Sequence, residues 1–154
     1  MALSGENYKN FLERAMTGPE FTALRKRFDK TQKQMAQLLG VSIKAVHSYE
    51  QGWRSVPDHV EKQLLLLAVS ANRKHTRQKE CWTINRCPAS VRRQCPAWEF
   101  DRGNLCWLIN GTICNGMVHR TWKEKIRVCR KCPVLTALLD DAPAPASAGK
   151  EQGK

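Results

Sequence analysis

All seven cysteines of the chain lie in its second half. In chain order they are Cys81, Cys87, Cys95, Cys106, Cys114, Cys129 and Cys132. Thiolates bind soft metal ions, and thiols can be oxidised reversibly. Cys129 and Cys132 have the two-residue separation that lets two thiolates bind one ion. We therefore treat all seven cysteines as candidate metal ligands.

Three kinds of cysteine chemistry fit this spacing. Cys87, Cys95 and Cys132 are each followed by proline, a pattern also seen at ligands of bacterial iron–sulfur clusters. This favours an iron–sulfur cluster as the cofactor. Zinc is the alternative, although structural zinc sites usually present two close cysteine pairs. The third interpretation is metal-free thiols that act as a redox switch or as small core residues.

The cysteine-rich segment also contains an internal repeat. Cys81-Trp82-Thr83-Ile84-Asn85 recurs as Cys106-Trp107-Leu108-Ile109-Asn110, which predicts two similar half-modules that face one site. We expect the tryptophans of this segment to form the core of a domain too small to close with aliphatic side chains alone; they are Trp82, Trp98, Trp107 and Trp122. We expect His119 to be an exposed polar residue rather than a ligand.

The pattern from Cys81 to Cys132 resembles the two-CW domain. The match comprises the two Cys-Trp pairs, the Cys-Pro steps, the Cys-Trp-Leu-Ile-x-Gly-Thr-x-Cys run and the final Cys-x-x-Cys. The two-CW domain is a small Cys-rich unit found in bacteria, attached to regulatory and signalling domains. The resemblance thus implies a regulatory module and names no ligand.

The segment before the cysteines predicts two short helices joined by a tight turn. Thr31 and Gln34 form a capping box for a helix from Gln32 to Leu39, which Gly40 ends in the left-handed conformation. Ser42 caps a second helix that runs to about Gln51, before a stop at Gly52. The inward side carries Met35, Leu39, Val41, Val46 and Tyr49. The outward side carries Gln32, Lys33, Ile43, Lys44, His47 and Ser48.

Residues 31–57 resemble the phage-repressor-like (Xre/Cro) helix-turn-helix family. The matched motif is Thr-Gln…Ala…Leu-Gly-Val-Ser…Val…Glu-x-Gly-x-Arg-x-Pro, and Trp53 departs from it, which we interpret as packing on a neighbouring domain. In this family the second helix lies in the major groove and the first crosses the phosphate backbone. The resemblance implies that Gln32, Lys33 and Arg54 meet the backbone. The residues it implies at the bases lie at the start and outer face of the second helix: Ser42, Ile43, Lys44, His47 and Ser48.

Composition and length predict a mainly α protein with two small domains. A formal net charge of +12 over 154 residues suits a chain that neutralises phosphates. We expect an N-terminal extension with a short helix (1–16), a four-to-five-helix repressor-like DNA-binding domain (17–73), a basic linker (74–80), a small irregular Cys-rich domain (81–139) and a disordered tail (140–154). Phe21, Leu24 and Phe28 mark the helix before the motif, and Val60, Leu64 and Leu67 the helix after it.

The function that these features favour is sequence-specific transcriptional regulation. The expected partner is double-stranded DNA, bound by a homodimer, while the Cys-rich module binds a metal or cluster and senses redox state. The alternative is a DNA-binding or assembly protein whose zinc- or thiol-stapled module binds a protein partner. No apolar run long enough to span a bilayer and no signal peptide are evident, so we expect a cytoplasmic protein. Motifs of phosphate loops, serine nucleophiles and metalloproteases are missing, so we do not expect an enzyme.

Overall fold

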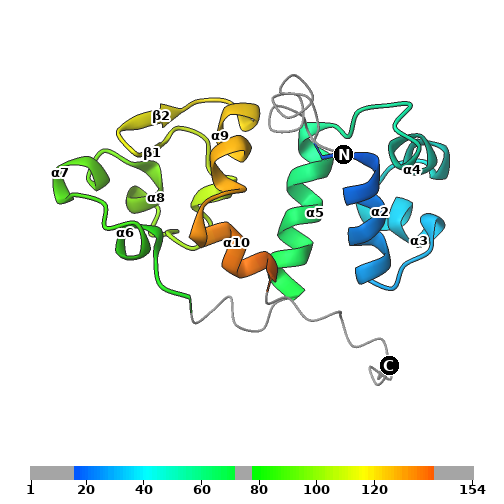
Figure 1. Cartoon of the computed structure of the whole chain (residues 1–154), viewed down its shortest axis with the longest axis horizontal. Helices are drawn as coiled ribbons and strands as arrows, with labels where there is room; N and C mark the ends of the chain where they lie inside the picture. The colour runs from blue at the N-terminus through cyan, green and yellow to red at the C-terminus, as the bar shows by residue number, and fades with distance from the viewer. Residues whose placement is uncertain (1–15, 72–77, 141–154) are drawn as a thin grey trace, which may run out of the picture. The chain divides into compact units, whose positions relative to one another are not determined.

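The computed structural model describes residues 16–71 and 78–140 (Figure 1). The described residues are mainly helical, as the sequence predicted. They fall into two compact units, residues 16–71 and residues 78–140, which we call the helix-turn-helix unit and the Cys-rich unit. The expected helix within 1–16 lies outside the described residues apart from Met16, which is buried. The tail predicted for 140–154 also lies outside them apart from Asp140, which belongs to the last helix of the chain and not to the tail. Most of the expected basic linker also lies outside them.

The helix-turn-helix unit consists of four helices: α2 (Gly18–Arg27), α3 (Gln32–Leu39), α4 (Ile43–Glu50) and α5 (Asp58–Ala71). The predicted bounds of α3 agree with the structure, and α4 ends with Gln51 as its C-cap. Helices α3 and α4 pack on each other, and α4 also packs on α2. The core is apolar: Phe21, Met35, Val46, Val60 and Leu64 are all completely buried.

Side-chain caps set the ends of α3 and α4. The Thr31 hydroxyl accepts a hydrogen bond from the Gln34 N–H at 3.1 Å, and the Gln34 side chain accepts one from the Thr31 N–H at 3.0 Å. Gly40 ends α3 at φ +65°, and the Ser42 hydroxyl caps α4 by accepting from the Ala45 N–H at 3.0 Å. These are the caps that the sequence predicted. Because they satisfy free amides at each helix start, they fix where both helices begin.

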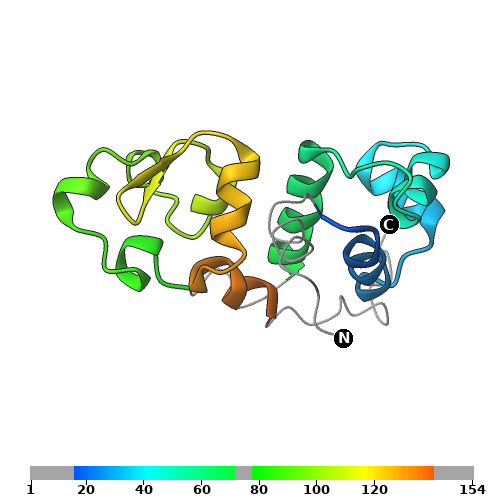
Figure 2. The ribbon, with the colours of Figure 1, turned by 45° about the horizontal axis from the view of Figure 1, so that its top comes forward.

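The Cys-rich unit begins with single helical turns. These are α6 (Cys81–Ile84), α7 (Ala89–Arg92), α8 (Pro96–Glu99) and a 3-10 turn, η2 (Cys106–Leu108). The chain then forms a hairpin of β1 (Thr112–Cys114) and β2 (Met117–His119), followed by α9 (Trp122–Cys129) and α10 (Pro133–Asp140). Figure 2 shows the hairpin and the two longer helices in a turned view. The unit is irregular only in its first half.

The prolines that follow cysteines start helices. Pro88 is the N-cap residue of α7, while Pro96 and Pro133 are the first residues of α8 and α10. Proline suits these positions because its missing N–H would have no partner in the first turn of a helix. The Cys-Pro steps therefore have a structural explanation that needs no iron–sulfur cluster.

None of the helices in residues 16–71 and 78–140 has the length and apolarity needed to cross a membrane.

Candidate nucleic-acid interface and cysteine cluster

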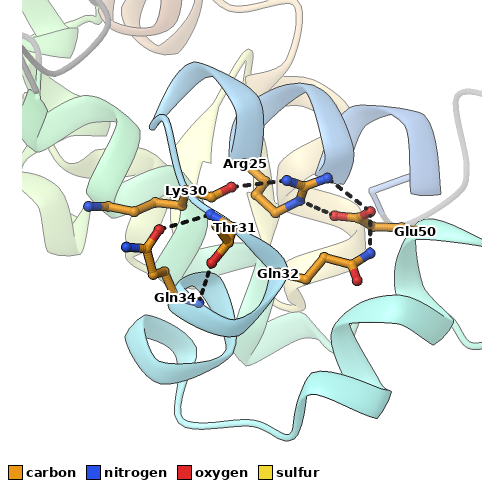
Figure 3. Close-up of polar contacts among 6 residues, drawn as sticks. All are labelled: Arg25, Lys30, Thr31, Gln32, Gln34 and Glu50. Atoms are coloured by element: carbon orange, nitrogen blue, oxygen red, sulfur yellow. Dashed lines mark hydrogen bonds and ion pairs between the residues drawn. The ribbon is translucent and has the colours of Figure 1, made fainter.

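A buried ion pair holds α3 and α4 in place. The Arg25 guanidinium of α2 pairs with the Glu50 carboxylate at the end of α4 and donates to the Lys30 carbonyl at 2.9 Å (Figure 3). The Gln32 amide, at the start of α3, donates to the same carboxylate at 2.9 Å. The two charged side chains are only 15% and 7% exposed. Side chains of α2 and α3 thus meet at the carboxylate of α4, and Arg25 also holds the α2–α3 loop.

The same contacts keep Glu50 ionised. Burial alone would raise the pKa of Glu50, but the hydrogen bonds from Arg25 and Gln32 and the positive charge of Arg25 together hold it below its ordinary value. The negative charge is thus a fixed part of the fold. Gln32, expected to meet phosphate, has its amide N–H group in this network in the free protein.

The candidate base-reading residues lie along one exposed side of α4. Lys44 and His47 are exposed, and Ile43 is 48% exposed although it is apolar. The opposite side of the helix is buried through Ala45, Val46 and Tyr49. Lys33 and Ser42 are also exposed. The division into inward and outward residues thus follows the predicted pattern, with Gln32, Val41 and Ser48 half-buried.

Three further contacts refine this side of α4. The Ser48 hydroxyl donates to the Lys44 carbonyl at 2.9 Å, so in the free protein its proton is committed to its own helix. The exposed Arg54 guanidinium lies 5.8 Å from the ring of Tyr49. Trp53 is 71% exposed, and its ring lies edge-on to His47 with 5.3 Å between centroids. Within the helix-turn-helix unit, the neighbour of Trp53 is therefore the outer face of α4, and packing on another domain stays a prediction.

In the Cys-rich unit, the two cysteines that begin the repeated sequence lie at one apolar cluster. Cys106 of η2 is a buried member of the cluster, and Cys81 of α6 packs against it. The backbone is fixed nearby, since the Cys81 N–H donates to the Gly103 carbonyl at 3.0 Å. Gly103 is buried, and a Cβ atom there would lie 2.5 Å from the Glu80 Cβ and 3.0 Å from the Cys81 nitrogen. A side chain at position 103 would therefore clash with the start of α6.

Several other cysteines surround this pair. Cys95 and Cys106 share one buried cluster with Ala97 and Val134, against which Cys81, Ile84 and Cys132 pack. The Asn85 amide donates to the Cys132 sulfur at 3.5 Å. Cys129 is buried at the end of α9, and burial raises its pKa to about 11. Burial likewise raises the pKa of Cys114 and of Cys87. All seven cysteines are free thiols.

The described residues contain no group of three or more His, Cys, Asp or Glu side chains arranged to hold a metal ion. The predicted pair Cys129 and Cys132 is held by a local hydrogen bond, from the Cys132 N–H to the Cys129 carbonyl at 3.0 Å. Metal binding by the seven cysteines stays a prediction from the sequence.

A buried lysine lies among the thiols. Lys125 of α9 is 1% exposed, and its ammonium donates to the Thr112 hydroxyl of β1. The same hydroxyl accepts from the Cys114 thiol at 3.9 Å. The Lys125 charge opposes the effect that burial has on the pKa of four thiols. The pKa of Cys81 is lowered overall, whereas those of Cys106, Cys114 and Cys129 stay raised. No carboxylate pairs with Lys125 in the part of the chain that the structure describes, so its charge acts on the thiols.

The burial of Lys125 was not predicted, although the apolar spacing of α9 indicates it. Trp122, Lys125, Ile126 and Cys129 follow the i, i+3, i+4, i+7 pattern of a buried helix face, and all four are buried. His119 was wrongly interpreted as exposed: it is 7% exposed, and its Nε2 atom has no hydrogen-bond partner among the described residues. The tryptophan prediction holds for Trp107 and Trp122 and is wrong for Trp98, which is 39% exposed.

Comparisons with protein-family models, curated proteins and solved structures find no match to this chain.

Proposed function

We propose that this chain is a sequence-specific transcriptional regulator that binds double-stranded DNA through α3 and α4. The observation that carries the proposal is the exposed side of α4, where Ile43, Lys44 and His47 form a short apolar and basic row on a helix whose other side is buried. A lysine can donate to guanine and an apolar side chain can contact a thymine methyl group. The net charge of +12 supplies the nonspecific attraction to phosphates.

We further propose that the regulator is a cytoplasmic homodimer. Repressor-like helix-turn-helix proteins read two half-sites whose spacing follows the symmetry of the dimer. In α5, Leu66 is 37% exposed between Leu65, which is buried, and Leu67, which is half-buried. This leaves apolar surface that a second subunit could cover.

The Cys-rich unit is, in this proposal, the regulatory part, and its chemistry is that of thiols. The packing of Cys81 and Cys132 against the cluster that holds Cys95 and Cys106 supports this choice among the three kinds of cysteine chemistry, because thiols gathered in this way need no further ligand. An iron–sulfur cluster or a zinc ion stays a prediction that iron and zinc analysis of freshly purified protein tests. The alternative function, a protein-interaction unit, predicts DNA binding that does not depend on thiol oxidation.

The test of DNA binding uses the full chain and a duplex selected from a random-sequence library. Lys44→Ala should weaken binding to the selected duplex by about 1–3 kcal/mol while nearly sparing a random duplex. Lys33→Ala should weaken binding to both duplexes alike, and it should lower the number of counterions released on binding by about one, as read from the salt dependence of the affinity. Lys123→Ala, an exposed lysine of α9 in the other unit, is the matched control. Equal losses on both duplexes for Lys44→Ala would contradict the proposed docking.

A further inference from the structure

We propose that Trp53 is a DNA contact whose indole ring packs on the sugar–phosphate backbone at the edge of the major groove, beside the end of α4. The inference rests on the proposed DNA-binding function and deepens it. It adds an apolar contact that does not depend on base sequence to a surface whose other contacts are made by base-reading and charged side chains.

The backbone that carries Trp53 is fixed by the turn that ends α4. The Trp53 N–H donates to the Ser48 carbonyl at 3.0 Å, and the Gly52 N–H donates to the Tyr49 carbonyl at 3.2 Å. Gly52 lies between them at φ +74°. Two such bonds around a left-handed glycine form the Schellman motif, which satisfies free carbonyls at the end of a helix. Trp53 therefore follows α4 in one defined position.

The Trp53 side chain lies on the outer face of α4 and is largely uncovered. Its ring is edge-on to His47, with 5.3 Å between centroids. An apolar contact between the residue after the glycine and the last turns of the helix often accompanies a Schellman motif, and His47 provides it here. Trp53 is nevertheless 71% exposed, more than any other large apolar side chain in residues 16–71 and 78–140. Most of the ring surface is thus available to a partner.

The neighbours of Trp53 make a surface that is both apolar and basic. Ile43 and His47 are four positions apart and so share one side of α4, and Ile43 is 48% exposed. Together with Trp53 they form a row along the outer face of the helix. Two exposed cationic side chains, Lys44 and Arg54, belong to the same stretch of chain. A partner that covers this row must offer apolar groups next to negative charges.

The DNA backbone has this combination. Residues 43–57 contain a single acid, Glu50, and its side chain is 7% exposed and paired with Arg25. The outer surface of the segment therefore offers cations without a competing exposed carboxylate. Each strand of a duplex alternates anionic phosphates with deoxyribose rings, whose faces are apolar. Contacts to phosphate and sugar fix the register of a protein on the duplex and carry no sequence information directly.

Trp53 and Arg54 divide this contact between an apolar group and a charge. The N–H groups of both residues donate to the Ser48 carbonyl, at 3.0 and 3.3 Å, so one turn positions the two side chains. Arg54 neutralises a phosphate when it binds, and Trp53 neutralises none. Loss of the Trp53 ring should therefore lower the affinity without changing the number of counterions released, whereas loss of the Arg54 charge should lower both.

The binding test measures the affinity of the full chain for the selected duplex and the random duplex at a series of salt concentrations. Trp53→Ala should weaken binding to both duplexes by the same factor, about tenfold, because the lost contact is apolar and independent of sequence. The salt dependence should stay that of the wild type. Arg54→Ala should weaken both duplexes and lower the number of counterions released by about one. Phe100→Ala removes a ring that is 63% exposed in the Cys-rich unit and, as the matched control, should change neither quantity.

A fluorescence test reports on the ring itself. Trp53 is the only one of the five tryptophans that precedes the Cys-rich unit, so the difference in emission between wild type and Trp53→Phe isolates its signal. Acrylamide should quench this signal efficiently in the free protein, and either duplex should protect it. Protection already present in the free protein would mean that another part of the chain or a second copy covers Trp53, and the inference would be overturned.

These measurements separate this inference from the proposed function. If the wild type prefers the selected duplex and Trp53→Ala binds both duplexes as tightly as the wild type, the inference fails and the proposed function stands. A loss confined to the selected duplex would show that Trp53 reads a base, and the assignment to the backbone would be wrong. If the wild type binds both duplexes alike and both protect Trp53, sequence reading fails while the contact stands. Should circular dichroism show that Trp53→Ala is misfolded, the quenching of wild type against Trp53→Phe decides.

Discussion

The helix-turn-helix unit and the Cys-rich unit use different side chains for the same structural tasks. In the first, aliphatic and aromatic side chains fill most of the core, and a part-buried ion pair joins Arg25 to Glu50. In the second, thiols occupy much of the core, and the buried charge is the cation of Lys125 among them. A buried carboxylate fixes a geometry, whereas buried thiols can react. The comparison suggests that the first unit is built for a constant shape and the second for a change of state.

The largest expected effect concerns the close contact of α2 with α4. A Cβ atom on Gly18 would lie 2.5 Å from the Glu50 carbonyl oxygen and 2.8 Å from the Tyr49 carbonyl oxygen, both backbone atoms. Gly18→Ala should therefore force α2 away from α4 and cost about 3 kcal/mol of unfolding free energy. Urea denaturation followed by tryptophan fluorescence and circular dichroism would measure it. Gly116→Ala, in the hairpin of the other unit, should leave the stability of the helix-turn-helix unit unchanged.

Glu50 gives the second test of constant shape. Because the pKa of Glu50 is lowered in the folded protein, its ionised form stabilises the fold above the ordinary carboxyl range, and this contribution is lost as the pH falls through the lowered pKa. Glu50→Gln should cost about 2 kcal/mol at pH 7, the usual scale for a hydrogen bond to a charged group. The difference from wild type should shrink below about pH 4.3.

The measurement for Glu50→Gln is a series of urea denaturation curves across pH. Glu99→Gln, which alters an exposed glutamate of the other unit, serves as the control and should show no such pH dependence. A loss for Glu50→Gln that is the same at pH 7 and pH 3 would mean that the carboxylate charge does not contribute.

Sequence alone predicted the first unit well because its signals are local. Thr31, Gly40 and Ser42 determine the helix ends through caps within three residues, and the apolar spacing determines the buried face. The hydrogen bond of Gln32 to the Glu50 carboxylate could not be predicted in this way. Its partner Glu50 is 18 positions away, and only packing brings the two together.

The second unit was predicted less well because its contacts are long-range. The repeat predicted two half-modules that face one site, and Cys81 and Cys106 do lie at one apolar cluster, but nothing local in the sequence places Lys125 near them. The hairpin did have a local signal that was overlooked: Asn115 and Gly116, at φ +53° and +75°, form a two-residue turn between β1 and β2. Thr112 and His119 are paired residues of this hairpin, and both are buried. The pairing explains why His119, which we expected to be exposed, lies in the interior.

Gly103 offers the counterpart of Gly18 in the Cys-rich unit. An added Cβ would meet the Glu80 Cβ at 2.5 Å and a ring atom of Trp82 at 2.8 Å. Since one of these neighbours is a side-chain ring that can shift, Gly103→Ala should cost less, about 1–2 kcal/mol. It should also shift the Cys81 backbone, whose N–H donates to the Gly103 carbonyl at 3.0 Å, and change the rate at which iodoacetamide alkylates Cys81 severalfold. Peptide mass mapping over time would measure this, and an unchanged rate would show that Gly103 does not position Cys81.

The smallest expected effect is on the reactivity of one thiol, and it tests whether Lys125 acts through its charge. Lys125→Met keeps most of the buried chain length and removes the ammonium, so the fold should lose little stability. The pKa of Cys81 should then rise, because one of the groups that lowers it is gone. The rate at which iodoacetamide alkylates Cys81 can be measured by peptide mass at a series of pH values. In Lys125→Met this rate should reach half its maximum at a higher pH than in wild type. Lys123→Met on the exposed side of α9 is the matched control. If Lys125→Met and Lys123→Met give the wild-type profile, the cation does not stabilise the thiolate, and the Cys-rich unit has no counterpart to the Arg25–Glu50 pair.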